Sequence, residues 1–272
     1  MSLTLIIGKN SNLSKFLYTN ISNCILISSR EVSKNIDILN KYKNKKINII
    51  FNNFQLAIEL NNLQSSSQYV TNAILSTSII LDYFNPIDIN KIIYTSSSSV
   101  YGNNILCKET DELKPMNLHA SLKVANEKLI EKYCLDNQID YTIARIFNMY
   151  GGDDKFSVVS KIINAYKNNE ELTIVNNGNA IRDFIYIDDV VFIYKILLEI
   201  KDARVLNIGT GSGSSIKGIL DFLSHNSVRI NVKNIFRDEL KTSTSDARLL
   251  YKIIGKRNFM DVENYLRKEL NL

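Results

Sequence analysis

Cysteine, histidine, proline and tryptophan are scarce in this chain, whose 272 residues include three cysteines, two histidines, two prolines and no tryptophan. The cysteines, Cys24, Cys107 and Cys134, form no C-x-x-C motif, and no histidine cluster accompanies them. The sequence therefore predicts neither a disulfide framework nor a zinc or other metal site. Cysteine usage of this kind favours a reducing compartment, and we expect a cytoplasmic protein.

Long apolar runs and blocks of like charge are also missing. No stretch approaches about 18 uninterrupted apolar residues, so we expect no membrane insertion. The opening MSLTLIIGKN lacks a charged leader and a small-residue cleavage site, which is not typical of a signal peptide. The 33 basic and 28 acidic side chains are interleaved. This pattern argues against a nucleic-acid partner but suits a small molecule that carries phosphate.

The chain does contain a regular alternation of strand-like and helix-like segments. Short apolar runs predict buried strands at 3–7, 24–28, 47–51, 91–96 and 140–147. Helical spacing occupies 12–20, 66–84 and 121–137 between them. This order predicts an α/β fold with a doubly wound parallel sheet.

The second half of the chain departs from this alternation. A β-rich run at 172–189 is followed by a helix at 190–200, a strand at 204–211 and a final amphipathic helix. We expect residues 1–152 to form one domain, to which 184–210 return. Residues 153–183 and 211–272 are then expected to form a smaller lobe, threaded into the first domain.

The first strand runs into the segment LIIGKNSNLSKFL, which has the layout of a dinucleotide-binding turn. The expected spacing G-x-x-G-x-x-G reads Gly8, Ser11 and Ser14 here, so serine stands where two glycines are expected. The main chain around Asn10, Ser11 and Leu13 would then face a pyrophosphate at the start of a helix. An ordinary strand-to-helix turn with polar residues is the alternative.

The end of the second strand bears on which dinucleotide is bound. An acidic residue about 20 positions after the first glycine would bind the ribose of NAD. Ser28, Ser29 and Arg30 stand there instead, and their hydroxyl and guanidinium groups suit the 2′-phosphate of NADP. Glu31 would serve NAD if the register slips, and a solvated loop is a further alternative.

Further motifs follow in a distinctive order. They are YTSSSSVYG at 94–102, HASLK at 119–123, ARIFNMYG at 144–151, NGNAIRDFIYIDDVV at 177–191, LNIGTG at 206–211 and FRDELKTSTSDARLLYKIIG at 236–255. In this order the chain resembles the extended short-chain dehydrogenase/reductase family of nucleotide-sugar epimerases, dehydratases and ketoreductases. The resemblance implies a Rossmann-type dinucleotide-binding domain, a small, partly interleaved C-terminal substrate lobe and a homodimer.

The resemblance also implies roles for individual residues. Ser97, four residues before Tyr101, matches the hydroxyl that binds the substrate oxygen, and Lys123 matches the lysine of the Y-x-x-x-K motif, which holds the nicotinamide ribose. The tyrosine of that motif, the acid/base, is replaced by His119. Ser98 lies beside Ser97 and is assigned to the substrate.

Other positions are implied to contact the substrate or the cofactor. Asn148 matches a substrate-binding asparagine, Arg182 matches an arginine that contacts the nucleotide diphosphate, and Arg237 is the nearest candidate for a second one. Asn53 and Phe54 lie where small alanines usually pass the cofactor, and both are bulkier than alanine.

His119 is suited to acid–base chemistry on physical grounds. Histidine titrates near ~6.5, and the neighbouring Lys123, one helical turn away, would push it towards the neutral form. A neutral imidazole still offers an N–H that can polarise a carbonyl, directly or through a bridging water. A structural or solvated role is the alternative, and for His225, at an apparent helix end, we expect only capping or solvation.

Together with Ser28, Ser29 and Arg30, the resemblance implies an NADP-dependent reductase, with NAD as the alternative cofactor. Its substrate would be a 4-keto-6-deoxy sugar nucleotide in cell-surface polysaccharide precursor synthesis. A C4 epimerase and a catalytically silent nucleotide-binding scaffold are the alternatives. A dehydratase is less favoured because Ser98 and Ser99 replace its Asp-Glu pair. The helix at 118–135, through Leu129, Ile130 and Tyr133, would supply either a dimer interface or core.

Overall fold

The computed structural model describes residues 2–53 and 66–272 of the chain, so the expectation for Phe54 lies outside the described residues. The chain divides into two compact units. The first unit comprises 1–100, 113–145 and 191–206, and the second comprises 101–112, 146–190 and 207–272. Each unit is described by itself.

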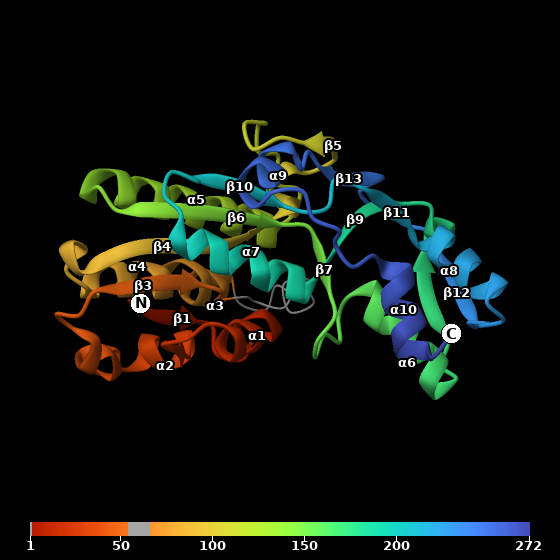
Figure 1. Cartoon of the computed structure of the whole chain (residues 1–272), viewed down its shortest axis with the longest axis horizontal. Helices are drawn as coiled ribbons and strands as arrows, with labels where there is room; N and C mark the ends of the chain where they lie inside the picture. Colours follow the sequence, from red (N-terminus) through yellow and green to blue (C-terminus); the bar gives the residue numbers. More distant parts are fainter. Residues whose placement is uncertain (1, 54–65) are drawn as a thin grey trace. The chain divides into compact units, whose positions relative to one another are not determined.

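A six-stranded sheet with the order β10-β6-β4-β3-β1-β2 forms the centre of the first unit (Figure 1). Its strands are β1 (Leu3–Ile7), β2 (Cys24–Ile27), β3 (Ile47–Phe51), β4 (Ile89–Ser97), β6 (Asp140–Ile146) and β10 (Val205–Ile208). β1 pairs in parallel with both β2 and β3, and β3 pairs in parallel with β4. The predicted Rossmann-type parallel sheet is therefore confirmed. The order reverses between β1 and β3, which is where such sheets bind ligands.

The helical segments of this unit follow the predicted alternation with some differences. They are α1 (Asn12–Asn20), α2 (Ser29–Lys34), η1 (Ile36–Tyr42), α3 (Ser66–Val70), η3 (Thr71–Leu75), α4 (Ser76–Tyr83), η4 (Pro86–Asp88), η5 (Ser98–Tyr101), α5 (Leu118–Asn137) and α7 (Ile187–Glu199), which begins in the second unit. The helix expected at 66–84 contains a π-helical turn, η3. The strand expected at 24–28 ends at Ile27 because Ser28 caps α2.

One face of α5 packs into the core of the first unit. Ile130 is fully buried there, and Leu129 and Tyr133 pack against the same cluster. Of the two alternatives for this apolar face, the structure shows core. Among the described residues, no helix is long and apolar enough to cross a membrane.

The second unit is built on a sheet with the order β11-β9-β13-β5, with β7 paired to β9, and on the two-stranded sheet β12-β8. The strands are β5 (Asn104–Cys107), β7 (Asn148–Tyr150), β8 (Leu172–Val175), β9 (Ile181–Tyr186), β11 (Gly213–Ser215), β12 (Val232–Ile235) and β13 (Thr242–Ser245). The helices are α6 (Val158–Asn168), η6 (Asn176–Gly178), α8 (Ile216–His225), α9 (Arg248–Ile254) and α10 (Val262–Leu270).

The borders between the units differ from those expected. Residues 101–112 were expected in the first domain, but β5 pairs with β13 and so belongs to the second unit. Residues 184–190 also lie in the second unit, because β9 pairs with β7, β11 and β13. His225 ends α8, where its Nδ1 atom lies 2.7 Å from the Asp221 carbonyl oxygen, as expected of a capping histidine.

Candidate functional site

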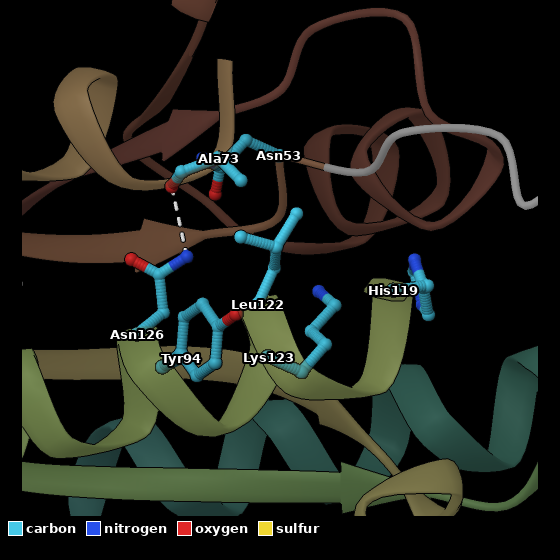
Figure 2. A pocket seen from close by; sticks show the side chains of 7 residues that line it. All are labelled: Asn53, Ala73, Tyr94, His119, Leu122, Lys123 and Asn126. Carbon is cyan, nitrogen blue, oxygen red and sulfur yellow. Dashed lines mark hydrogen bonds between the residues drawn. The ribbon is translucent and has the colours of Figure 1, made fainter. Parts of the chain in front are cut away.

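His119 and Lys123 lie one turn apart on α5 and line a common pocket in the first unit (Figure 2). Asn53, Ala73, Tyr94, Leu122 and Asn126 complete its lining. Figure 2 shows both side chains on the upper side of α5, with Lys123 between Leu122 and His119. The cavity has a free volume of about 20 Å³, which is room for about one water molecule.

Lys123 is buried, with 4% of the residue exposed. Its Nζ atom donates a 2.7 Å hydrogen bond to the carbonyl oxygen of Thr95 and lies 5.0 Å from the ring centre of Tyr94. Burial lowers the pKa of Lys123 to about 7, against the opposing charge of Glu127. A lowered pKa of this kind allows the amine to release a proton near neutral pH.

A buried ion pair that the sequence patterns did not predict lies one turn further along α5. Glu127 and Arg145 are 1% and 5% exposed, and an Nη2 atom of Arg145 lies 2.8 Å from Oε2 of Glu127. Ser96 donates a further hydrogen bond to Glu127. Glu127 follows Lys123 by four residues, and this spacing places both side chains on one face of a helix. The spacing alone could therefore have indicated that Glu127 lies near Lys123.

His119 is half-buried. Burial, and then the charge of Lys123, lower the pKa of His119 to about 4. The imidazole is therefore neutral at physiological pH, as the sequence predicts. A neutral imidazole has one N–H donor and one acceptor nitrogen, so it can polarise a carbonyl or pass a proton between neighbours.

Ser97 ends β4, two residues after the Thr95 carbonyl that holds Lys123. Its oxygen accepts hydrogen bonds from the main-chain N–H of Ser99 at 3.2 Å and from the Ser99 hydroxyl at 3.0 Å. Because both bonds use the oxygen as an acceptor, the Ser97 hydroxyl hydrogen can be donated to a substrate oxygen. Ser98 begins η5 and is largely buried.

The turn after β1 has the geometry of a dinucleotide-binding loop. Gly8 adopts a φ of +110°, and a Cβ atom there would lie 2.2 Å from the Asn52 carbonyl oxygen and 3.0 Å from the Asn53 nitrogen. Only glycine fits this position. Ser11 caps α1, and its oxygen accepts a 3.0 Å hydrogen bond from the N–H of Ser14. Ser11 and Ser14 thus occupy the expected positions at the start of the helix.

The other cofactor candidates lie near this turn. The N–H groups of Gly8 and Lys9 bond to the Ile27 oxygen, next to Ser28. The Ser28 hydroxyl accepts from the Glu31 N–H at 3.3 Å and so caps α2. Asn10 and Arg30 are exposed, Ser29 is half-buried and Leu13 is buried, so Leu13 can offer only its main chain.

Asn53 connects this turn with the pocket of His119 and Lys123, because it lies beside Gly8 and also lines that pocket. Its Nδ2 atom donates to the Ser76 hydroxyl at 3.2 Å.

The turn at Gly8 and the start of α1 are compatible with a bound dinucleotide. A Cβ atom at Gly8 would fill the turn, and α1 begins directly behind it. The first N–H groups of a helix have no intrahelical acceptor, so the Leu13 N–H is suited to a phosphate oxygen. The start of α1 would therefore hold the pyrophosphate, and the resemblance implies that Lys123 would hold the nicotinamide ribose.

The substrate candidates Asn148, Arg182 and Arg237 all lie in the second unit. Asn148 donates a 3.0 Å hydrogen bond to the Asp183 carbonyl oxygen. Arg182 is held by the Leu240 carbonyl oxygen at 2.6 Å and by Glu239 at 3.4 Å. Arg237 is exposed and lines a hollow of about 460 Å³. Arg237 is therefore the more exposed cation, and Arg182 is already paired within the second unit.

Asp183, in the R-D-F motif, organises the second unit. It is fully buried and accepts hydrogen bonds from Thr210, Gly211 and Ser245. Its carboxylate therefore joins the glycine-containing turn after β10 to β13. The sequence motif contained this residue, but the partners lie 27 to 62 positions away.

Sequence comparison places the chain among known enzymes. It is 33% identical over 159 residues to a putative UDP-glucose 4-epimerase of Methanocaldococcus jannaschii. The matched region covers 56% of this chain and 52% of that protein. It is 29% identical over 186 residues to a dTDP-D-glucose 4,6-dehydratase of Dictyostelium discoideum. The matched region covers 63% of this chain and 43% of that protein. The chain thus spans about half the length of these curated relatives.

Structural comparison shows the same fold in solved proteins. MoeE5 in complex with UDP-glucuronic acid and NAD matches with a TM-score of 0.88 at 20% identity, over 99% of this chain and 98% of that chain. The family model described as the NAD dependent epimerase/dehydratase family matches residues 28–209, more than half of the chain. The family that the ordered motifs indicated is thereby confirmed, and the chain belongs to the NAD dependent epimerase/dehydratase family.

Proposed function

We propose that this protein is an NADP-dependent reductase that acts on a keto sugar nucleotide of the 4-keto-6-deoxy type. One observation carries the proposal. His119, a neutral imidazole, and Lys123, with a pKa of about 7, share one pocket on one face of α5. This pocket lies beside the turn after β1 at Gly8, which we call the cofactor turn. Reduction of a ketone needs a proton donor that works near neutral pH, and this pair meets that need without a tyrosine.

The proton is supplied by the ammonium form of Lys123. Neutral His119 donates its N–H to the carbonyl oxygen and polarises it. As the alkoxide forms, His119 passes that proton on and takes another from Lys123, directly or through the one water that the cavity admits. Lys123 ends the step as a neutral amine held by the Thr95 carbonyl, and solvent then restores its proton.

Ser97 positions the substrate, because its hydroxyl hydrogen can be donated to the reacting oxygen. Arg182 and Arg237, both in the second unit, stay predictions of the resemblance for the diphosphate. When bound, the dinucleotide supplies the hydride. Ser28, Ser29 and Arg30 favour the 2′-phosphate of NADP, because Arg30 is an exposed cation in the first turn of α2, shortly after β2 ends. A homodimer and a part in polysaccharide precursor synthesis stay predictions of the resemblance, and a cytoplasmic location stays a prediction from the cysteine usage.

Calorimetric titration with NADPH and with NADH tests the cofactor part of the proposal. We expect NADPH to bind more tightly, and Arg30→Ala to remove the difference. Lys34→Ala, a basic residue at the end of the same helix, is the matched control. Equal binding of the two dinucleotides by the wild type would contradict the NADP preference.

A catalytically silent nucleotide-binding protein is the second candidate. The serines of the cofactor turn and the missing tyrosine favour it. The two candidates differ in turnover: a silent protein binds a dinucleotide, but does not oxidise NADPH in the presence of a keto sugar nucleotide.

A further inference from the structure

A three-residue hydrogen-bond network closes the cofactor turn of the first unit. Asn52, directly after β3, donates from its Nδ2 atom to the hydroxyl of Ser11 at 2.7 Å and to that of Ser14 at 2.8 Å. The two hydroxyls are 2.9 Å apart. We call Ser11, Ser14 and Asn52 the turn clamp.

Two of the three side chains of the turn clamp are fully buried. Ser14 and Asn52 have no exposed surface, and the Asn52 N–H bonds to the Ile7 oxygen at 2.8 Å. The Asn52 carbonyl lies against Gly8, where no side chain fits. Within the described residues the Asn52 Oδ1 atom has no hydrogen-bond partner. A buried polar atom of this kind is costly unless a donor reaches it.

The turn clamp occupies the main-chain N–H of Ser14, a donor that could otherwise bind a phosphate oxygen. The Ser11 oxygen accepts the N–H of Ser14, one of the first N–H groups of α1. At a helix start these N–H groups bind anions, so a pyrophosphate must compete with the Ser11 hydroxyl. The Cβ and hydroxyl of Ser11 also occupy space that glycine leaves for the approach of the pyrophosphate.

We propose that Ser11, held by Ser14 and Asn52, weakens dinucleotide binding so that the cofactor is exchanged at each turnover. The inference rests on the proposed function and deepens it. A reductase must release its oxidised cofactor after every reaction, whereas an epimerase regenerates its cofactor in place. One net hydrogen bond corresponds to about a fivefold change in an equilibrium constant, and we expect the release of the Ser14 N–H from Ser11 to have an effect of about that size.

The test uses Ser11→Gly, because glycine loses little as an N-cap. Calorimetry with NADPH and with NADP+ should show a Kd about fivefold lower for this variant, together with slower release in stopped-flow measurements. Ser157→Gly is the matched control. Ser157 caps α6 with the same geometry, accepting from the Ser160 N–H at 3.1 Å, and its replacement should leave the Kd unchanged.

Asn52→Ala provides a second variant in case Ser11→Gly unfolds, and it should also tighten binding. An unchanged or higher Kd in folded variants would overturn the proposal, as would the absence of binding in both the wild type and the variants. Failure of the proposed function is seen separately. It would appear as tightened binding with no oxidation of NADPH when a keto sugar nucleotide is added.

Discussion

Lys123 donates a 2.7 Å hydrogen bond from its Nζ atom to the main-chain oxygen of Thr95. This bond fixes a buried amine near the end of β4, two residues before Ser97. It also explains how a lysine remains in the core, since a buried amine without acceptors would be strongly unfavourable. The acid–base part of the account depends on this arrangement.

The pH dependence of reduction should report the titration of Lys123. Because the ammonium form supplies the proton, kcat/KM for ketone reduction should fall as the pH rises through about 7. Lys123→Met should reduce kcat/KM by about a hundredfold or more and remove this pH dependence. Lys128→Met, an exposed lysine on the same helix, should change neither. A wild-type profile that stays flat between pH 6 and 8 would count against Lys123 as the donor.

His119 should make folding stability sensitive to acid. Its pKa is lowered from 6.5 to about 4 in the folded protein, so the unfolded chain binds a proton first as the pH falls. The stability is fully present above about pH 6.5 and is lost towards pH 4, by up to about 3 kcal/mol.

Urea unfolding of His119→Gln should show a smaller loss of stability over this range than the wild type. His225→Gln, which changes an exposed histidine, is the control and should behave as the wild type does. If both variants lose stability in parallel with the wild type, His119 is not the group responsible.

The Glu127–Arg145 ion pair should support both stability and the charge of Lys123. Arg145→Met leaves a buried carboxylate without its partner and should cost about 3–5 kcal/mol in urea unfolding. Replacing both residues, as Glu127→Gln with Arg145→Met, should cost less than the single change. An additive loss in the double variant would contradict a coupled pair.

Glu127→Gln should lower the pH at which kcat/KM falls. The Glu127 charge raises the pKa of Lys123, so its removal should move the inflection of the kcat/KM profile below about pH 7. A shift to higher pH, or none in a folded variant, would show that Glu127 has only a structural role.

Gly8→Ala should disrupt the cofactor turn through steric overlap. Its φ of +110° and the 2.2 Å approach to Asn52 together predict a loss of about 2 kcal/mol or more in stability. Gly255→Ala is an informative control, because Gly255 has a φ of +78° but nothing within 4 Å of the added Cβ. Equal losses in the two variants would show that backbone strain alone, without the overlap, explains the effect.

Local sequence patterns predicted the parallel sheet, the turn at Gly8 and the shared face of His119 and Lys123. Each of these depends on residues close together in the chain. The turn clamp was not predicted, because Asn52 lies 41 positions from Ser11. The pairing of β5 with β13 was missed for the same reason. The 3₁₀-helix η1 was also missed, because the segment IDILNKY has no clear period of either kind.

The most direct test of the account is the oxidation of NADPH in the presence of a 4-keto-6-deoxy sugar nucleotide, followed in wild type, His119→Ala and His119→Tyr. We predict substrate-dependent oxidation by the wild type, a large loss of kcat in His119→Ala, and activity in His119→Tyr, because Lys123 can also serve a phenol. Wild-type protein that binds NADPH but does not oxidise it with this substrate, while His119→Tyr does, would contradict the claim that His119 is a working part of the site.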